Sequence, residues 1–492
     1  MNNLNPSLNR TPGKIYHIHI MGICGTGMAA LAGMLQHSGY QVTGSDMQVY
    51  PPMSTFLKSL GINVANGYCY ANLQPAPDLV IVGNVITRDN QEAIALAELG
   101  LPYLSFPQAL AHFFIQFLTS IVITGTHGKT TTCSLLATAL FAAKLDPTFM
   151  IGGIVKEFDA NYRIGKGKYF IAEGDEYDTA FFDKESKFLH YRPQIAVITS
   201  IEFDHADIFD NLNAIKRSFK KFVSLLPEDG LLIANFDDEN VVEISEEARC
   251  NVESYGLNPS HTWSLDNISI SGGRSCCDII KDGLPWSSME IALPGRHNCL
   301  NSLAVCGVMN HLGLQPDTIK KSLKKFSGVK RRQEVRGMIR GVMVIDDFAH
   351  HPTAVRETLL ALKASYPQQR LIAVFEPRTN SSRRAIFQHD YADSFAAADL
   401  VMLREPEPIR GVGKDDLFSC DRLAEDLNKK DTSLKAQSFK DTDELLRQLL
   451  TVVKQNDIVA ILSNGSFDNI HKRLLDKLEK HPDSQQVTIN RA

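Results

Sequence analysis

The segment 125–132, Gly-Thr-His-Gly-Lys-Thr-Thr-Thr, combines the residue types that bind a nucleoside triphosphate. Glycines let backbone N–H groups face phosphate oxygens, a lysine meets the charge of the β- and γ-phosphates, and a hydroxyl beside it can hold Mg²⁺. An apolar run over 120–124 precedes the segment and an amphipathic stretch over 133–143 follows it, which predicts a strand, a glycine turn and a helix. Gly125 lies three positions before Gly128 instead of the usual five, so we interpret the loop as a shortened phosphate-binding loop.

Two further apolar segments end in residues that can bind a cation. Residues 169–172 lead into Glu173, and residues 195–201 lead toward the pair Asp204-His205. Because parallel strands bring their carboxyl ends to one edge of a sheet, we expect Glu173 and His205 to converge beside the loop lysine. Thr130 and Glu173 are therefore predicted Mg²⁺ ligands, and His205 is the predicted ligand of a second metal ion.

A second glycine turn lies near the amino terminus. Alternation over 14–20 predicts a strand, which is followed by the turn 22–28 and a helix over 29–37, and a second strand over 41–44 ends at Ser45-Asp46. This order is typical of a Rossmann-like βαβ unit with an acid where a ribose hydroxyl would lie. The glycine pattern G-x-x-G-x-G disfavours NAD, and a purely structural tight turn remains an alternative.

A third α/β pattern begins near residue 331. It predicts strands over 341–346, 370–375, 400–403 and 457–462, and helices over 354–363 and 470–478. Before it, the Ser-, Gly- and Asn-rich stretch 245–292 predicts a small antiparallel excursion. The pair His350-His351 could bind zinc, but no cysteine stands at zinc-finger spacing, which disfavours that interpretation.

Length and composition limit the classes of protein to consider. A chain of 492 residues predicts about three domains. The net charge of −5 comes without a basic tail, so nothing predicts nucleic-acid binding. Nine cysteines without a C-x-x-C motif favour a reducing cytoplasm, and no apolar run predicts a signal peptide or a membrane span. We expect a disordered arm over 1–14 and domains over 15–115, 116–330 and 331–492.

These motifs, in this order, resemble the Mur ligase family of ATP-dependent enzymes that form amide bonds. The resemblance runs over about 15–480 and rests on the shortened loop, E-x-D-E at 173–176, Asp204-His205, H-N-x-x-N at 297–301, R-R-x-E at 331–334 and D-D-F-A-H-H-P at 346–352. It implies an α/β fold with three domains. These are an N-terminal Rossmann-like domain, a central P-loop ATPase-like domain and a C-terminal Rossmann-like domain.

Finer passages resemble the family members that join UDP-N-acetylmuramate to the peptide L-Ala-γ-D-Glu-meso-diaminopimelate. The passages are 22–28, 50–55, 83–84, 178–191, 376–380 and 463–465. Cys24 and Phe348-Ala349 depart from the members that add L-alanine, which typically have Gly and Tyr-Gly there. Addition of L-alanine to the same nucleotide sugar is the alternative within the family. Folylpolyglutamate synthesis is a more distant ligase alternative, and a P-loop ATPase that drives a conformational switch is the alternative from another class.

The resemblance implies that the γ-phosphoryl group of ATP moves to the lactyl carboxylate, and that an amine then displaces phosphate from the acyl phosphate. Such chemistry depends on positioning and on charge stabilisation. The catalytic residues implied are Lys129, Glu173, His205 and Arg332. The cofactors are ATP and Mg²⁺, and the partners are two small molecules, UDP-N-acetylmuramate and the murein tripeptide. We expect a monomer or weak homodimer in the cytoplasm.

The remaining expected contacts fall into three groups. The expected ATP contacts are Gly125, Thr126, His127, Gly128, Lys129, Thr130, Thr131, His297, Asn298, Arg332, Asp347 and His350. The expected UDP-sugar contacts are Gly22, Cys24, Gly25, Thr26, Gly27, Ser45, Asp46 and Asn84. The expected acceptor contacts are Arg378, Asn380 and Asn464. Arg378 is expected there because the planar fork of an arginine suits the carboxylates of diaminopimelate. Arg383 or Arg384 could serve in place of Arg378.

Overall fold

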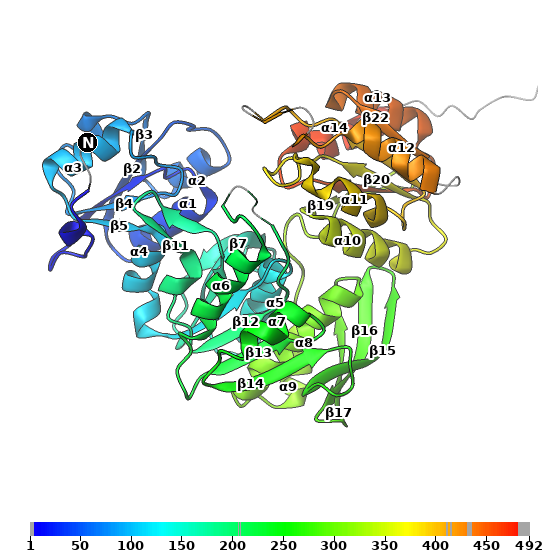
Figure 1. Cartoon of the computed structure of the whole chain (residues 1–492), viewed down its shortest axis with the longest axis horizontal. Coiled ribbons are helices and arrows are strands. Elements are labelled where there is room, and N and C mark those ends of the chain that lie inside the picture. The colour runs from blue at the N-terminus through cyan, green and yellow to red at the C-terminus, as the bar shows by residue number, and fades with distance from the viewer. Residues whose placement is uncertain are drawn as a thin grey trace, which may run out of the picture.

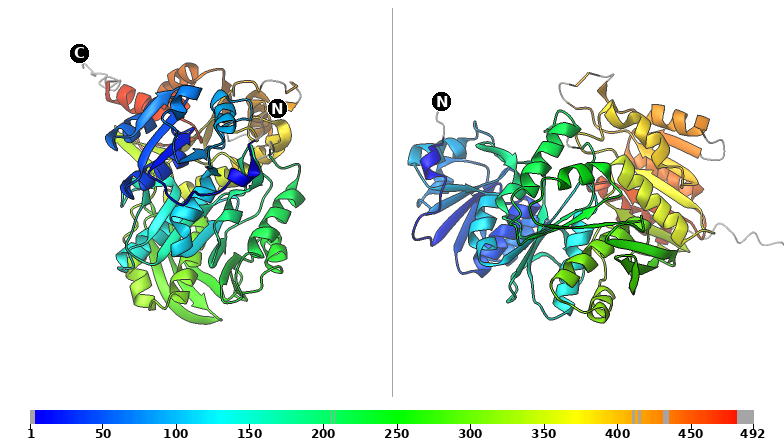
Figure 2. Two further views of the ribbon diagram at one scale, coloured as in Figure 1. Left: turned by 90° about the vertical axis from the view of Figure 1, so that its left-hand side faces the viewer. Right: turned by 60° about the horizontal axis from the view of Figure 1, so that its bottom comes forward.

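The computed structural model describes residues 4–204, 206, 208–409, 412–413, 416–430 and 435–480. These residues form three α/β units, each built on a sheet whose central strands run parallel (Figure 1). The central unit lies between the other two, as the right-hand view of Figure 2 also shows. The predicted three-part α/β architecture is confirmed.

The first unit is a five-stranded parallel sheet in the order β3-β2-β1-β4-β5. Its strands are β1 (His17–Met21), β2 (Gln41–Asp46), β3 (Asn63–Asn66), β4 (Leu79–Val82) and β5 (Tyr103–Ser105). Its helices are α1 (Thr26–His37), α2 (Met53–Ser59), α3 (Gln91–Leu99) and α4 (Phe106–Phe113). Every residue of β4 is buried, as expected for a parallel strand covered on both faces. The Rossmann-like topology places the turn after β1 at the carboxyl edge of the sheet.

Residues 4–14 do not form the disordered arm that we expected. They include a short 3₁₀ helix (Pro6–Leu8), and Leu4 is buried against the first unit. The Asn9 side chain donates to the carbonyl of Tyr103 and exchanges two hydrogen bonds with Gln108. The polar composition of this segment gave no sign of that pairing, because it depends on a partner about a hundred residues away.

The central unit is a ten-stranded sheet in the order β17-β16-β15-β14-β13-β12-β6-β9-β7-β8. Its strands are β6 (Thr119–Thr124), β7 (Thr148–Val155), β8 (Ala160–Arg163), β9 (Tyr169–Gly174), β12 (Ile195–Ile198), β13 (Leu231–Asn235), β14 (Asn251–Gly256), β15 (Trp263–Ser271), β16 (Arg274–Lys281) and β17 (Leu284–Ile291), beside a hairpin of β10 (Asp178–Ala180) and β11 (Asp183–Ser186). Its helices are α5 (Lys129–Ala142), α6 (Leu212–Val223), α7 (Glu239–Ser245), α8 (Arg296–His311) and α9 (Pro316–Leu323). The expected antiparallel excursion is the meander β15-β16-β17.

The third unit is a six-stranded sheet in the order β18-β19-β23-β20-β21-β22. Its strands are β18 (Glu334–Ile339), β19 (Val342–Asp347), β20 (Leu371–Phe375), β21 (Leu400–Arg404), β22 (Lys435–Phe439) and β23 (Ile458–Leu462). Its helices are α10 (Pro352–Ser365), α11 (Gln388–Ser394), α12 (Cys420–Lys430), α13 (Thr442–Val452) and α14 (Ile470–Lys480). The two edge strands β18 and β22 were not predicted, because exposed residues interrupt both of them and neither shows a continuous apolar run.

The first and central units touch through β8 and α1. The hydroxyl of Tyr162 lies 3.3 Å from Nδ1 of His37, and a Cβ atom placed on Gly33 would lie only 2.4 Å from that hydroxyl. This glycine therefore permits the close approach of the two units. No helix in the described part of the chain is both long and apolar enough to cross a bilayer.

Candidate active site

A cavity of about 940 Å³ lies where the three units meet. The first unit contributes Thr26, Gly27 and Phe106 to its wall. The central unit contributes the glycine loop and the start of α8, and the third contributes residues near β19 and the turn after β23. Every expected ATP contact except Gly125 lines this cavity, as do Glu173 and Asn464.

The loop between β6 and α5 has the backbone shape that a phosphate requires. Gly125 and Gly128 adopt φ angles of +128° and +82°. A Cβ atom on Gly125 would lie 2.2 Å from Oγ1 of Thr199, and one on Gly128 would lie 2.7 Å from Oδ1 of Asn301. Both positions therefore require glycine on grounds of conformation and of space. The loop opens helix α5, so its amides face the cavity from a helix N-terminus.

Lys129 is buried and held by two acceptors. Its Nζ donates to the carbonyl of Gly125 at 2.6 Å and to Oε2 of Glu176 at 2.9 Å. Burial favours the neutral amine, but the carboxylates of Glu176 and Asp175 outweigh it and raise the pKa of Lys129. The lysine is therefore a fixed positive charge at the cavity wall, with Glu176 as its ion-pair partner.

Thr130 and Glu173 come together as predicted. Oγ1 of Thr130 donates to Oε1 of Glu173 at 2.7 Å, and the amide of Gly152 donates to Oε2 at 2.7 Å. The contact arises because β6 and β9 are parallel neighbours that pair Ile123 with Glu173. Burial, with Asp175 nearby, raises the pKa of Glu173, so a cation at this point would relieve an unfavourable concentration of negative charge. The donor set of hydroxyl and carboxylate oxygens suits Mg²⁺.

His205, the predicted ligand of a second metal ion, lies outside the described residues. Its neighbour Asp204 is buried and lines the cavity. The assignment of His205 to catalysis and to a metal therefore stays a prediction.

Helix α8 presents His297 and Asn298 to the cavity from its first turn. Burial lowers the pKa of His297 to about 4, with a further contribution from His127. Nδ1 of His297 is buried and makes no hydrogen bond to the described residues, and the carboxylate nearest to it is Oε2 of Glu357 at 3.9 Å. Nδ2 of Asn298 donates to the carbonyl of Pro294 at 2.8 Å, which fixes its orientation.

The third unit closes the cavity with Arg332, Asp347 and His350. The guanidinium of Arg332 lies 4.9 Å from the ring centre of Phe348, and its NH2 group donates to Oγ1 of Thr130 at 3.3 Å. Asp347 accepts the backbone N–H groups of Gln333 and Ala349 at 2.7 and 2.8 Å. Burial lowers the pKa of His350 and raises that of Asp347. Arg332 thus bridges the third unit and the predicted Mg²⁺ ligand.

The glycine turn of the first unit is fastened to strand β2. The amides of Gly22 and Ile23 donate to the carbonyl of Ser45, and the amide of Cys24 donates to Oδ2 of Asp46 at 2.9 Å. Of the expected UDP-sugar contacts, Thr26 and Gly27 line the cavity. The others lie beyond its lining, namely Gly22, Cys24, Gly25, Ser45, Asp46 and Asn84. Their assignment to the nucleotide sugar stays a prediction.

Of the three expected acceptor residues, one lines the cavity and two lie beside it. Asn464 lines the cavity, and its Oδ1 is buried without a hydrogen-bond partner among the described residues. The side chain of Arg378 is half exposed and packs on Gly465, where a Cβ atom would lie 2.2 Å from its Cδ. Asn380 accepts a hydrogen bond from Arg383 at 3.1 Å. Arg378 and Asn380 flank the cavity without lining it.

Several cavity residues were not selected from the sequence. Lys187 lies in the passage 178–191, with its Nζ 4.0 Å from the ring centre of Tyr177 and 3.8 Å from Oδ2 of Asp175. Burial lowers the pKa of Lys187 despite that carboxylate. Asn301, the last residue of H-N-x-x-N, packs against the glycine loop. Glu202 and Glu357 also line the cavity, and neither could be selected from a local sequence pattern because their contacts, with Thr353 and His297 respectively, cross unit boundaries.

The sequence matches three domain families in the same order as the three units. These are the Mur ligase family catalytic domain over residues 17–118, the Mur ligase middle domain over 123–309 and the Mur ligase glutamate ligase domain over 331–465. Together they account for well over half of the chain.

Relatives match over nearly the whole length. The chain is 37% identical to the UDP-N-acetylmuramate–L-alanyl-γ-D-glutamyl-meso-2,6-diaminoheptandioate ligase of Escherichia coli (strain K12), over 95% of this chain and 100% of the relative. It is 36% identical to the UDP-N-acetylmuramate–L-alanine ligase of Alkaliphilus metalliredigens (strain QYMF), over 81% of this chain and 85% of the relative. A solved murein peptide ligase from Psychrobacter arcticus 273-4 superimposes with a TM-score of 0.69 at 33% identity, over 95% of this chain and 99% of that one. The chain belongs to the Mur ligase family.

Proposed function

We propose that this protein joins UDP-N-acetylmuramate to the peptide L-Ala-γ-D-Glu-meso-diaminopimelate and that ATP drives the reaction. The observation that carries the proposal is the single cavity in which a phosphate-binding loop, an arginine from the third unit and the glycine turn of the first unit meet. A ligase that uses three substrates requires such a junction. The relatives from Escherichia coli and Psychrobacter arcticus support the peptide as acceptor.

The triphosphate would lie along the loop between β6 and α5. Lys129 is already charged and fixed at the cavity wall, so phosphate oxygens would replace Glu176 as its partner. Arg332, bonded to Thr130 across the unit boundary, would meet the charge that develops as the γ-phosphoryl group moves to the lactyl carboxylate. His297 and Asn298 would contact the base, where Nδ1 of His297, which makes no hydrogen bond to the described residues, offers a hydrogen-bonding group.

Thr130 and Glu173 would hold Mg²⁺, since their oxygens already converge and the pKa of Glu173 is raised by burial and by the neighbouring Asp175, which a cation would offset. When bound, Mg²⁺ supplies charge neutralisation for the phosphates. The residues of this chain position the reactants and exclude water, because the acyl phosphate would lie among three units. Lys187, buried between the first and central units, would face the negative diphosphate of the sugar nucleotide.

Addition of L-alanine to the same nucleotide sugar is the second candidate function. The Alkaliphilus metalliredigens relative, which is named for that reaction, favours it at nearly the same identity. The departures at Cys24 and at Phe348-Ala349 argue for the peptide instead. We also propose a cytoplasmic location, which the nine free cysteine thiols support.

Phosphate release tests the ligase reaction against the ATPase-switch alternative. Purified protein with ATP and Mg²⁺ would be assayed alone, with UDP-N-acetylmuramate, and with UDP-N-acetylmuramate plus tripeptide. We expect sustained phosphate release only in the third mixture. Equal release in the first mixture would refute the ligase proposal and favour an ATPase.

A further inference from the structure

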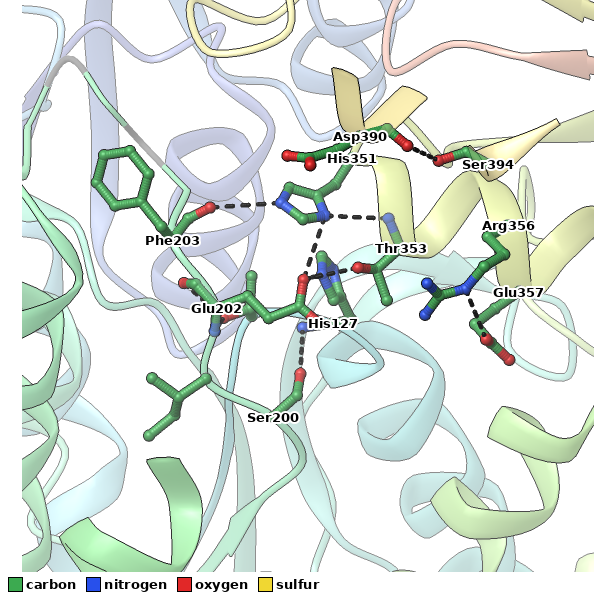
Figure 3. Close-up of polar contacts among 12 residues, drawn as sticks. His127, Ser200, Glu202, Phe203, His351, Thr353, Arg356, Glu357, Asp390 and Ser394 are labelled. Carbon is green, nitrogen blue, oxygen red and sulfur yellow. Dashed lines mark hydrogen bonds and ion pairs between the residues drawn. The ribbon is translucent and has the colours of Figure 1, made fainter. Parts of the chain in front are cut away.

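Two histidines and a glutamate converge at the wall of the cavity, where the central and third units meet (Figure 3). His127 belongs to the loop between β6 and α5, Glu202 follows β12, and His351 is the N-cap residue of α10. One nitrogen of each histidine and one oxygen of the glutamate lie within 4.8 Å of one another. The sequence analysis considered His351 as a zinc ligand only together with His350 and disfavoured that pair, and it did not select His127 or Glu202 as its partners because the three residues are far apart along the chain.

The contacts of His351 determine which of its nitrogens carries the proton. Nε2 lies 3.3 Å from the carbonyl of Phe203, which can only accept, so Nε2 bears the hydrogen. Nδ1 lies 3.3 Å from the backbone N–H of Thr353, which can only donate. Nδ1 of the neutral ring therefore carries the lone pair, which accepts from Thr353 and lies 3.5 Å from Oε2 of Glu202, and a metal ion at this nitrogen would take the place of the Thr353 N–H. An imidazole whose far nitrogen donates to a backbone carbonyl is the arrangement that protein metal sites use to orient a ligand histidine.

Glu202 faces this lone pair with an acceptor of its own. Its Oε2 lies 3.5 Å from Nδ1 of His351 and 3.4 Å from Nε2 of His127, and Thr353 donates to the same oxygen at 2.7 Å. Two acceptors this close repel each other unless a cation lies between them. The two separations are near the edge of a tetrahedron built from metal–ligand bonds of about 2.0–2.1 Å, which is about 3.3 Å.

We propose that His127, Glu202 and His351 form a binding site for a divalent transition-metal ion of the zinc class, and that this ion links the central unit to the third. Two imidazoles and a carboxylate are a donor set for zinc and its first-row neighbours, whereas Mg²⁺ prefers oxygen ligands. The site is therefore chemically distinct from the oxygen pair Thr130 and Glu173. A fourth position would be open, because His127 and Glu202 line the cavity.

The burial of the three side chains suits an ion that enters from solvent. His351 is 6% exposed, while the side chains of His127 and Glu202 are 22% and 34% exposed. One ligand is thus fixed in the third unit, and two stand at the cavity wall. Because the ligands come from two units, a bound ion would stabilise the docked arrangement of those units by mass action.

Metal binding can be measured without nucleotide and without turnover. We would titrate the full chain with Zn²⁺ by calorimetry in excess Mg²⁺, and with Co²⁺ by visible absorption, which reports coordination geometry. We expect one Zn²⁺ per chain and the intense bands of four-coordinate Co²⁺. His351→Gln and Glu202→Gln should each weaken the binding by about tenfold or more. The control His389→Gln removes an exposed histidine of the same unit and should bind Zn²⁺ like the parent chain.

The proposal fails if all three variants bind Zn²⁺ equally or if the parent chain binds none. It also fails if Co²⁺ shows only weak six-coordinate bands, which would indicate adventitious surface binding. If His351→Gln does not fold, the Glu202→Gln variant and a matching His127→Gln variant provide the same comparison, with circular dichroism as the check on folding.

Discussion

Lys129 is paired with a buried carboxylate, and this changes what its removal is expected to do. From the sequence alone, a loop lysine serves phosphate charge and its loss leaves the fold intact. In the structure, Lys129→Ala would remove the ammonium group that neutralises the carboxylates of Glu176 and Asp175. Losing one member of a buried pair costs about 3–5 kcal/mol. Loss of activity in this variant would therefore combine two effects.

A double variant separates the two effects. We expect Lys129→Ala to lower kcat by about 100-fold or more and to lower Tm, because both phosphate charge and the Glu176 pair lose their cation. Adding Glu176→Gln should recover much of the lost Tm without recovering kcat. Thermal unfolding and phosphate release on the same preparations check this. Recovery of activity in the double variant would remove Lys129 from the mechanism.

His297 predicts a pH dependence of stability. Its pKa is lowered to about 4 in the fold, chiefly by burial, while the unfolded chain keeps a value near 6.5. As the pH falls, the unfolded state therefore binds the proton before the folded state does. The contribution of His297 to the free energy of unfolding is fully present above about pH 6.5 and is lost as the pH falls toward 4. With its side chain 30% exposed, we expect a difference of about 1 kcal/mol between pH 7 and pH 5.

The variant His297→Gln should lose less stability than the parent chain over that pH interval. Tm values at the two pH values provide the measurement, and the exposed His389→Gln should behave like the parent. An equal fall in Tm for all three proteins would mean that His297 is not held neutral by its surroundings.

At the scale of elements, the pairing of parallel strands explains why part of the site was predictable. The apolar runs of β6, β9 and β12 predicted three buried strands. Because the carboxyl ends of parallel strands share one edge of a sheet, Glu173 was expected beside the loop that carries Thr130, and the structure places it there. Lys187, Glu202 and Glu357 obey no such rule. Lys187 directly follows β11 and begins a 3₁₀ helix, Glu202 lies in the loop after β12, and Glu357 lies on helix α10 of another unit. Their positions depend on how the units dock, which no local pattern records.

The glycine turn between β1 and α1 yields a prediction about ligand discrimination. A Cβ atom on Gly25 would make only ordinary contacts, the nearest at 3.5 Å, so Gly25→Val should fold. Because its side chain would stand where the sugar nucleotide approaches the backbone, we expect weaker UDP-N-acetylmuramate binding and unchanged ATP binding. Calorimetry with each ligand decides this, and Gly13→Val, at an open position, is the control. Loss of ATP affinity alone would reverse the assignment of the units.

The loop after β20 yields a prediction about the acceptor. Arg378 keeps a half-exposed guanidinium on Gly465, at the carboxyl edge of the third sheet and beside the cavity residue Asn464. Arg378→Lys keeps the charge but loses the planar fork, so we expect the KM for tripeptide to rise about tenfold while the KM values for ATP and UDP-N-acetylmuramate change little.

The control for that prediction is Arg422→Lys, at an exposed position on α12 of the same unit, which should leave all three KM values unchanged. An Arg378→Lys variant whose three KM values match those of the parent would exclude Arg378 from the acceptor site. Arg383 and Arg384 would then be the next arginines to test.

At the scale of the whole molecule, each unit supplies what the others lack. The first provides a glycine turn, the central provides the phosphate loop with Thr130 and Glu173, and the third provides Arg332 and the loop of Arg378. The cavity at their junction supports a reaction of three substrates. Because the chain is similar both to relatives named for adding the peptide and to relatives named for adding L-alanine, the identity of the acceptor is what an experiment must determine.

A competition between the two acceptors tests the central claim most directly. The protein would be incubated with ATP, Mg²⁺ and UDP-N-acetylmuramate in the presence of equimolar L-alanine and L-Ala-γ-D-Glu-meso-diaminopimelate, and the products would be identified by mass spectrometry during the initial rate. We expect the UDP-N-acetylmuramoyl tripeptide as the dominant product. Predominant formation of UDP-N-acetylmuramoyl-L-alanine would contradict the account.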